Sequence, residues 1–223
     1  MGQPFMKGVL RECLRDEAVS EVVVVGRSKT GVGHPKLREI VHADLAELMA
    51  RPGMQEELSG YDACFFCLGV SSAGMTEEAY HRVTYELTLT VARALSAWNP
   101  DLTFAYVSGQ GTDSSERGRS MWARVKGKTE NHLLRLPVDA YMFRPGYIQP
   151  MHGITSKTPL YRAVYAVAAP LYPLLRRLVP NQVTSTERLG RAMIAVAAAG
   201  APHRLLGTRE INNAAVLHTA VLP

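Results

Sequence analysis

A serine and a lysine of this chain stand where they could act on a bound carbonyl compound. Ser108 ends an apolar run, TFAYVS, and Lys126 lies on the helical pattern that follows it. A serine hydroxyl can donate a hydrogen bond to a carbonyl oxygen. An ammonium group can hold a ribose and lower the pKa of a neighbouring acid. Their order after a strand predicts a site at the carboxyl end of that strand.

Trp122 stands four residues before Lys126, on the same face of the expected helix. A tyrosine at this position could pass a proton to a substrate. An indole N–H can donate a hydrogen bond, but it has no usable titration and cannot be a general acid. We prefer the interpretation that Trp122 occupies the catalytic position. The alternative is a core aromatic residue that packs against the sheet.

Basic residues follow another expected strand, in the glycine-rich loop GRSKTGVG of residues 26–33. The loop lacks the Lys-Ser/Thr pair of a P-loop and is not G-x-G-x-x-G. Arg27, Ser28 and Lys29 come directly after the strand, where basic side chains can meet the 2′-phosphate of NADP. Two solvated surface charges are an equally good interpretation when these residues are taken alone.

The positions of these residues depend on the secondary structure around them. Along the chain the hydrophobic pattern alternates between the periodicity of strands and that of helices. We expect strands over residues 21–27, 39–45, 61–70, 103–109 and 139–148, and helices over residues 9–14, 46–58, 76–98, 121–136 and 184–200. Strands that alternate with helices of this length predict a parallel sheet with helices on both faces. We therefore expect one α/β domain over residues 1–223, in which residues 150–200 form a helix-rich portion on the substrate side.

The amino-acid composition indicates which class of ligand the protein binds and in which cellular compartment it lies. The net charge of +5 favours an anionic partner, but the basic residues are scattered, which favours a phosphorylated small molecule over nucleic acid. Three cysteines cannot make a disulfide framework, which indicates a reducing compartment such as the cytoplasm. Cys64 and Cys67 point to opposite faces of the expected strand, so we interpret them as core residues. We expect no bound metal.

We expect no secretory signal and no membrane span. The amino-terminal residues contain no continuous apolar region. The apolar residues 163–175 are too few to cross a bilayer and contain Pro170 and Pro173. They predict a packed helix or helix pair, with attachment to a membrane surface as the minor alternative.

From residue 8 to about residue 211, the chain resembles an atypical short-chain dehydrogenase/reductase of the Tat-interacting-protein-like branch of NAD(P)-binding, epimerase-like proteins. The segments that carry the resemblance are VLREC, VVVVGRS, HADL, DACFFCLGVSSAGM, YVSGQGTDSSERGR, WARVKGKTEN, FRPGYIQP and TSTERLGRAM. The resemblance implies a Rossmann-like fold, a doubly wound parallel sheet. It also implies these roles: Arg27 at the NADP phosphate, Asp44 at the adenine, Leu68 and Gly69 at the dinucleotide backbone, Ser108 at the substrate carbonyl, Lys126 at the nicotinamide ribose, and Pro145 and Gly146 at the cofactor edge.

The sequence departs from this family at Trp122, where the family pattern has tyrosine, and at the amino end. Such proteins open with an apolar strand and a G-x-x-G-x-x-G turn, whereas here MGQPFM precedes the first helix. The missing strand would lie at the centre of the sheet. The two neighbouring strands must close on each other, recruit QPFM, borrow a strand from a partner, or leave a weakly folded domain. Because Pro4 lacks an N–H, the second option is poor. We expect an N-terminally shortened fold with reduced stability.

The sequence thus predicts an NADP-preferring, reductase-like or epimerase-like protein with impaired or absent catalysis and weak dinucleotide affinity, NAD being possible in place of NADP. The alternative is a non-catalytic nucleotide-sensing or protein-interaction module on the same fold. The substrate stays open, because the pocket segments 71–75, 149–154 and 184–187 are not diagnostic, and a homo-oligomer is neither required nor excluded.

Overall fold

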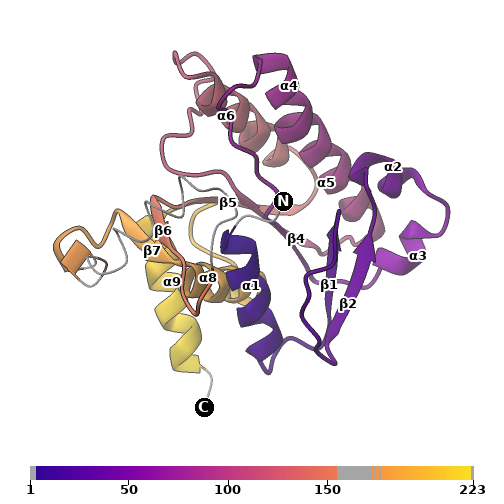
Figure 1. Cartoon of the computed structure of the whole chain (residues 1–223), viewed down its shortest axis with the longest axis horizontal. Coiled ribbons are helices and arrows are strands. Elements are labelled where there is room, and N and C mark those ends of the chain that lie inside the picture. The colour runs from indigo at the N-terminus through magenta and orange to yellow at the C-terminus, as the bar shows by residue number, and fades with distance from the viewer. Residues whose placement is uncertain (1–3, 155–171, 173, 176, 222–223) are drawn as a thin grey trace.

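The computed structural model describes residues 4–154, 172, 174–175 and 177–221 (Figure 1). Its strands are β1 (Val22–Gly26), β2 (Leu37–Val41), β3 (Ala63–Phe66), β4 (Thr103–Val107), β5 (Asp139–Arg144), β6 (Tyr147–Gln149), β7 (Val183–Ser185) and β8 (Leu205–Gly207). Its helices are α1 (Pro4–Arg15), α2 (Leu45–Ala50), α3 (Met54–Leu58), α4 (Glu77–His81), α5 (Leu87–Trp98), α6 (Met121–Leu133), α8 (Thr186–Ala199) and α9 (Thr208–Val221), and a π-helical turn, η1 (Arg82–Glu86), joins α4 to α5.

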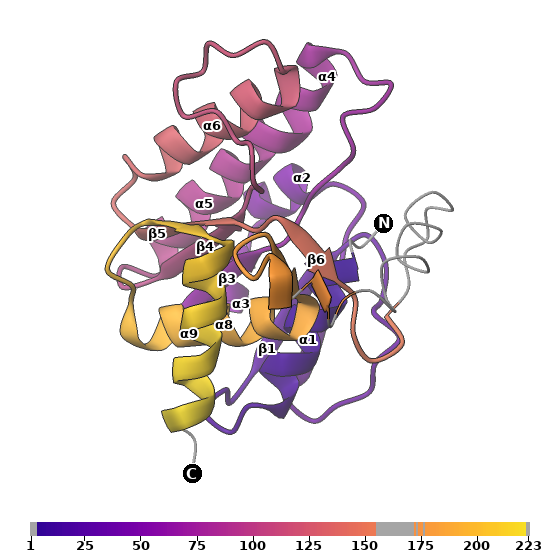
Figure 2. The same ribbon diagram turned by 90° about the vertical axis from the view of Figure 1, so that its left-hand side faces the viewer.

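The strands pair in parallel throughout, as the alternation of strands and helices predicts. A four-stranded sheet has the order β3-β4-β5-β8, while β1 pairs with β2 and β6 pairs with β7. Helices α4, α5 and α6 cover one face of the larger sheet, and α1, α8 and α9 cover the other (Figures 1 and 2). The expectation of a doubly wound α/β fold is therefore confirmed.

Each face of the sheet has its own apolar core, because side chains alternate along a strand. On β4, Phe104 and Tyr106 pack in the cluster beneath α5, whereas Ala105 and Val107 pack in the cluster beneath α8. Strand β5 alternates in the same way. This double burial explains why both strands read as continuous apolar runs.

Side chains cap the starts of two helices, and the cap at Asp44 corrects an expectation, because the strand expected over residues 39–45 ends at Val41. The Asp44 carboxylate accepts hydrogen bonds from the backbone N–H groups of Ala46 (2.8 Å) and Glu47 (3.2 Å) at the start of α2. The Thr76 hydroxyl accepts one from Ala79 N (3.2 Å) at the start of α4. Each satisfies backbone donors that have no partner inside the helix.

Some expected boundaries are wrong. The helix expected over residues 76–98 contains the π-helical turn η1, and the helix expected to reach residue 136 ends at Leu133. The strand expected over residues 139–148 is divided at Pro145 and Gly146 into β5 and β6, and β6 pairs with β7 in a separate sheet, where Tyr147 N donates to Gln182 O (2.9 Å). The helix-rich portion over residues 150–200 also contains β7, and most of the apolar stretch 163–175 lies outside the described residues. In the part of the chain described here, no helix has the length and hydropathy to cross a membrane.

The β1-β2 pair and the four-stranded sheet stay apart. Within the described residues, no backbone ladder joins β1 to β3. A cavity of about 610 Å³ lies between them, lined by residues of both strands and of α1, α5 and α8. The QPFM segment does not fill it as a strand, because Pro4–Met6 already belong to α1. Neither direct closure nor recruitment of QPFM, the first two expected solutions, is adopted.

Helix α6 packs closely on the loop after β4 at Gly127, and a substitution there tests this packing. A Cβ atom at Gly127 would collide with the backbone carbonyl of Asp113. We expect Gly127→Ala to destabilise the domain by about 1–3 kcal/mol, as overpacking does, although alanine favours a helix by about 1 kcal/mol over glycine. The free energy of unfolding in urea measures this. Gly33→Ala is the control, because open space surrounds Gly33. Equal stability of Gly127→Ala and the unmodified chain would contradict the close packing.

Candidate functional site

The candidate catalytic residues meet at the carboxyl ends of β4 and β5. Ser108 follows the last residue of β4, and Arg144 is the last residue of β5. Helix α6 lies beside both strand ends and carries Lys126 and Glu130, which are one helical turn apart. The structure thus brings Ser108 and Lys126 together, as their order in the sequence predicts.

The Ser108 hydroxyl is directed into the protein. The residue is only 3% exposed, and its Oγ lies 2.5 Å from Glu130 Oε1 and 3.2 Å from the carbonyl oxygen of Phe143. A hydroxyl has a single proton to donate. In this arrangement Ser108 donates it to the protein, so a bound carbonyl compound would have to compete with Glu130 for the hydroxyl.

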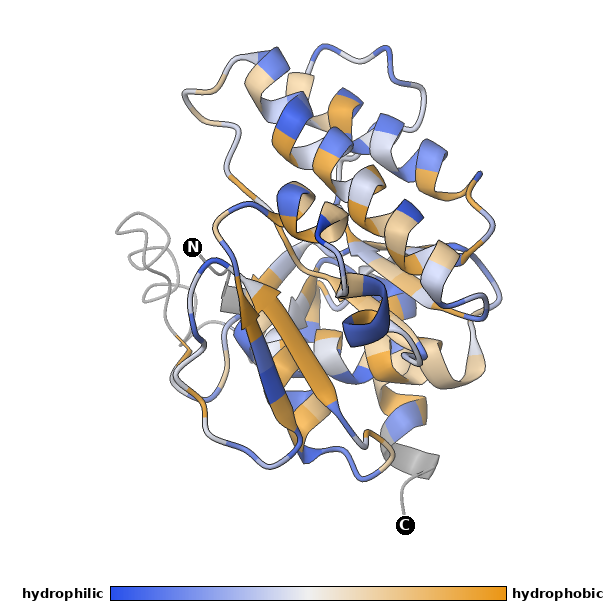
Figure 3. Cartoon of the chain, turned by 90° about the vertical axis from the view of Figure 1, so that its right-hand side faces the viewer, coloured by the Kyte–Doolittle hydropathy of each residue, from blue (hydrophilic) through white to orange (hydrophobic). Residues whose placement is uncertain are grey.

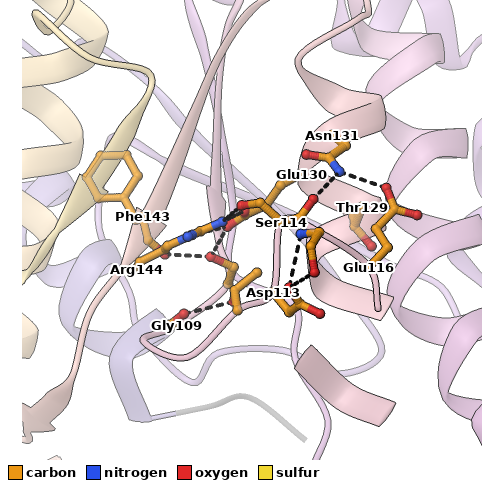
Figure 4. A network of polar contacts seen from close by, with 12 residues as sticks. Gly109, Asp113, Ser114, Glu116, Thr129, Glu130, Asn131, Phe143 and Arg144 are labelled. Carbon is orange, nitrogen blue, oxygen red and sulfur yellow. Dashed lines mark hydrogen bonds and ion pairs between the residues drawn. The ribbon is translucent and has the colours of Figure 1, made fainter. Parts of the chain in front are cut away.

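Glu130 is the buried anion of the site. Its side chain has 0% exposure, and Arg144 donates to both of its oxygens, from Nε to Oε1 (3.0 Å) and to Oε2 (3.1 Å) and from Nη2 to Oε2. Arg144 Nη2 also donates to Ser114 Oγ (2.6 Å). Figure 4 shows Arg144 reaching from its strand toward Glu130, with Ser114 beside the pair. Removing one member of such a pair leaves an uncompensated buried charge, at a cost of about 3–5 kcal/mol.

Lys126 is the cation nearest to the strand end. Its ammonium donates to the backbone oxygen of Ser108. Burial lowers the pKa of Lys126 to about 8, and the negative charge of Glu130 opposes part of that shift. Because this pKa lies close to neutral pH, a ligand that binds beside Lys126 can change its protonation state.

Trp122 lies one turn before Lys126 on α6 and packs on the loop that follows Ser108. A Cβ atom on Gly111 would lie 3.3 Å from Trp122 Cη2, so the indole ring sits directly against this glycine. Gly111 has a φ of +86°, a conformation that favours glycine. The ring is partly buried. The structure thus places Trp122 beside the candidate site, and its catalytic position stays a prediction.

Pro145 and Gly146 lie at a close crossing of three segments. Pro145 O accepts a hydrogen bond from Gln110 N (2.8 Å), and Gly146 N donates to Thr208 Oγ1 (2.8 Å). A Cβ atom on Gly146 would collide with the carbonyl group of Gln182. Glycine is required here by the approach of the backbone. Beside this crossing is a polar cavity of about 300 Å³, lined by Gln110, Gly111, Arg144, Asn181, Gly207, Thr208, Arg209 and Glu210.

The other candidate cofactor residues lie at the ends of the remaining strands. Leu68 and Gly69 follow β3, and Arg27, Ser28 and Lys29 form an exposed segment after β1. Asp44 follows β2, and its carboxylate caps α2. The cavity between β1 and β3 separates the group on β1 and β2 from the group on β3, β4 and β5.

Sequence reasoning missed three charged residues of the site: Glu39, Glu130 and Arg144. Glu39 lies on β2, and its carboxylate accepts a hydrogen bond from Thr30 N (2.5 Å), in the loop that carries the basic residues. Hydrogen bonds from Thr30 hold the pKa of Glu39 below its usual value. No local pattern marks these residues, since each partner lies on another element or loop of the fold. The FRPG segment alone indicated that Arg144 stands at a strand end.

Of the expected pocket segments, two lie together. Met151 N donates to Thr186 Oγ1 (3.1 Å), and His152 Nε2 lies 2.8 Å from Glu187 Oε2. Residues 149–154 and 184–187 therefore form one surface, whereas residues 71–75 form a separate turn. No group of three metal-binding side chains occurs among the residues that the structure describes.

Comparisons with known proteins support the fold. No family model matches the chain, and no curated protein matches its sequence. The Bordetella bronchiseptica enzyme WbmF in complex with NAD+ is similar at 17% identity, with a TM-score of 0.63, over 97% of this chain and 74% of that one. A short chain dehydrogenase from Burkholderia cenocepacia in complex with NADP is similar at 16% identity, with a TM-score of 0.61, over 98% and 93%. Helicobacter pylori ADP-L-glycero-D-manno-heptose-6-epimerase is similar at 15% identity, with a TM-score of 0.61, over 94% and 77%.

These likenesses establish the fold. The chain has a Rossmann-like, short-chain-dehydrogenase-like architecture. The narrower assignment to the Tat-interacting-protein-like branch stays a prediction.

The buried ammonium of Lys126 predicts how stability depends on pH. Its pKa is about 8 in the folded chain and about 10.4 when unfolded, so the unfolded chain binds more protons between these values. Stability contributed by this group therefore rises with pH across that window and is lowest below about pH 8. We expect the free energy of unfolding of the unmodified chain to rise by on the order of 3 kcal/mol relative to that of Lys126→Met between pH 7.5 and 10.5. Urea unfolding at several pH values measures the difference.

Lys126→Arg is the second arm of this experiment, because arginine stays charged across the window. It should lack the gain that the unmodified chain shows. If the free energy of unfolding changed with pH in the same way in all three chains, the lowered pKa of Lys126 would be contradicted.

Proposed function

We propose that the protein binds NADP at the carboxyl ends of its parallel strands and is a reductase-like or epimerase-like protein with impaired proton transfer. The observation that carries the proposal is the position of Lys126. Its ammonium lies against the end of β4, one turn from Trp122 on α6. A cation held there can bind the hydroxyl groups of a ribose.

The residues present fit a dinucleotide at both of its ends. Exposed Arg27 and Lys29 supply cations for a phosphate after β1, and the ammonium of Lys126 supplies a donor for a ribose at the end of β4. A bound nicotinamide would supply hydride transfer. The chain's own residues would hold it, Lys126 at the ribose and Leu68 and Gly69 along the backbone of the cofactor.

Two features of the chain favour weak binding and slow chemistry. The cavity between β1 and β3 divides the proposed phosphate contacts from the proposed ribose contact, so binding must fix two halves of the sheet relative to each other. Trp122 can donate a hydrogen bond but cannot deliver a proton. The similar enzymes WbmF and the Burkholderia cenocepacia dehydrogenase were solved with NAD+ and NADP respectively, which supports a nicotinamide dinucleotide as the ligand class.

A second candidate function is a nucleotide-sensing or protein-interaction module without catalysis. The direction of the Ser108 hydroxyl favours it, because this hydroxyl contacts Glu130 and Phe143 O within the protein. Nucleotide binding without turnover of any carbonyl compound would support this candidate over the first.

Arg27→Ala tests the preference for NADP. A charge-assisted hydrogen bond to phosphate contributes about 1.5–3 kcal/mol, so we expect NADPH affinity to fall roughly 10- to 150-fold while NADH affinity changes little. Fluorescence titration of both dinucleotides measures this. Arg15→Ala is the control, because it removes one exposed positive charge at the end of α1. Equal loss of both dinucleotides in Arg27→Ala would contradict the phosphate contact.

Trp122→Tyr tests the impaired proton transfer. The unmodified chain should reduce a panel of aldehydes and ketones with NADPH slowly or not at all. A tyrosine beside Lys126 restores a general acid, which typically accelerates a reaction about 10²- to 10⁴-fold. Trp122→Phe is the matched control, since its ring also fits against Gly111 but carries no proton. Fast turnover by the unmodified chain that survives Trp122→Phe would show that another group delivers the proton.

A further inference from the structure

The cavity of about 300 Å³ beside the crossing at residues 145–146 is of a different kind from the larger one between β1 and β3. We call it the polar cavity, and residues 110–111, 144, 181 and 207–210 line it. In the part of the chain that the structure describes, this lining consists of polar or charged side chains and two glycines. Figure 3 shows β1 as hydrophobic along its length, so the larger cavity has an apolar wall. A charged ligand therefore fits the polar cavity and not the larger one.

Arg144 uses only part of its guanidinium group inside the protein. Its Nε and Nη2 atoms donate to Glu130 and Ser114. Its Nη1 atom has no hydrogen-bond partner among the described residues, and no described side-chain nitrogen or oxygen is both buried and unpaired. Nη1 is therefore accessible. Because Arg144 lines the polar cavity, Nη1 is the donor that it can offer to a ligand there.

Two other residues bring donors to the polar cavity from distant parts of the chain. Arg209 comes from the start of α9, and Asn181 comes from the residues before β7. Within the described residues, neither side chain has a hydrogen bond or an ion pair. With Arg144 the lining carries two positive charges, and Glu210 supplies its one negative charge. Guanidinium groups in such a setting bind an oxyanion with several acceptor oxygens, such as a phosphate or a carboxylate.

The polar cavity borders the proposed site of chemistry. Gly111 belongs to its wall, and a Cβ atom on Gly111 would lie 3.3 Å from the ring of Trp122. Arg144 also shares the carboxylate of Glu130 with the hydroxyl of Ser108. A compound whose anionic group lies in the polar cavity can therefore extend its remaining atoms toward Trp122 and the end of β4.

The volume of the polar cavity limits the size of its ligand. A water molecule occupies about 30 Å³ in the liquid, so the cavity has the volume of about ten waters. Pockets for small molecules in proteins begin at about this volume. The polar cavity thus has room for an anionic group with a few carbon atoms attached, and not for a whole dinucleotide.

We propose that the polar cavity binds the phosphate or carboxylate group of a small carbonyl substrate, through Arg144, Arg209 and Asn181. The inference rests on the proposed function for the reacting carbonyl group. The anion site itself does not require NADP, because Arg27 and Lys29 lie after β1, beyond the larger cavity.

The first experiment uses two pairs of ligands that differ in their charge. Dihydroxyacetone phosphate is compared with dihydroxyacetone, and pyruvate with its neutral methyl ester, by calorimetric titration of the unmodified chain. Because a charge-assisted hydrogen bond corresponds to roughly a 10- to 150-fold change in affinity, the charged member of at least one pair should bind more tightly by about that factor. The pair that shows the difference identifies the anion as phosphate or carboxylate. Equal affinities within both pairs would overturn the proposal.

Asn181→Asp and Asn213→Asp form a matched pair of variants. Both asparagines are exposed and both substitutions add one negative charge, but only Asn181 lines the polar cavity. Asn181→Asp should weaken binding of the preferred anion at least about tenfold by repulsion, whereas Asn213→Asp should leave the affinity unchanged. Equal weakening by both would show that the overall charge of the protein attracts the anion, and the proposal would be wrong.

Arg209→Ala and Arg27→Ala separate this inference from the proposed binding of NADP. Arg209→Ala should weaken binding of the preferred anion roughly 10- to 150-fold and leave NADPH affinity unchanged, and Arg27→Ala should do the reverse. Loss of the anion in Arg27→Ala but not in Arg209→Ala would place it after β1 and would overturn this inference. An unchanged NADPH affinity in Arg27→Ala would instead contradict the phosphate contact alone.

Glu210→Gln provides a check that misfolding cannot imitate. It removes the negative charge of the lining and keeps the size of the side chain, so binding of the preferred anion should strengthen at least about twofold. Unchanged or weaker binding would count against the proposal. Urea unfolding of each variant shows whether its fold is intact.

Discussion

A parallel sheet is held together mainly by the hydrogen bonds of its backbone ladders. In this chain, side-chain hydrogen bonds connect β1 and β2 to the start of β3. Between β1 and β3 the structure describes no ladder, and Arg38 on β2 connects the two halves instead. Arg38 donates to the carbonyl oxygen of Glu57 (2.7 Å) and to Tyr61 Oη, which in turn donates to Glu21. These contacts lie at the amino ends of the strands. The carboxyl ends, where ligands bind in such folds, lie at the opposite ends of these strands.

This arrangement bears directly on the proposed function. The basic segment after β1 and the cap of α2 belong to one half, while Lys126, Ser108 and the Pro145–Gly146 crossing belong to the other. A ligand that contacts both halves has to fix their relative position, and part of its binding free energy is used in doing so. Anything that completes the sheet would remove that cost. Strand pairing and dinucleotide affinity would then be coupled through the geometry of the sheet.

The second half of the site is organised by a single buried carboxylate. Glu130 accepts hydrogen bonds from Arg144 and Ser108, and so ties α6 to the ends of β5 and β4. The same charge supports the protonated form of Lys126 one turn away. Buried charges of this kind are tolerated only when they are paired and hydrogen-bonded. The network therefore positions Lys126, and it also explains why the Ser108 hydroxyl is directed inward.

The sequence by itself determined the elements and the architecture, because these depend on local patterns. Apolar runs predicted β1, β3, β4 and β5, Thr76 marked the start of α4, and the alternation of strands with helices predicted the parallel α/β fold. It also predicted that Ser108 and Lys126 would meet. Only the tertiary structure decided that the sheet stays open between β1 and β3, that Ser108 contacts Glu130, and that Glu39 reaches the basic loop. The partners in each of these contacts lie on different elements or loops, so their geometry follows from how these elements pack, which no local spacing encodes.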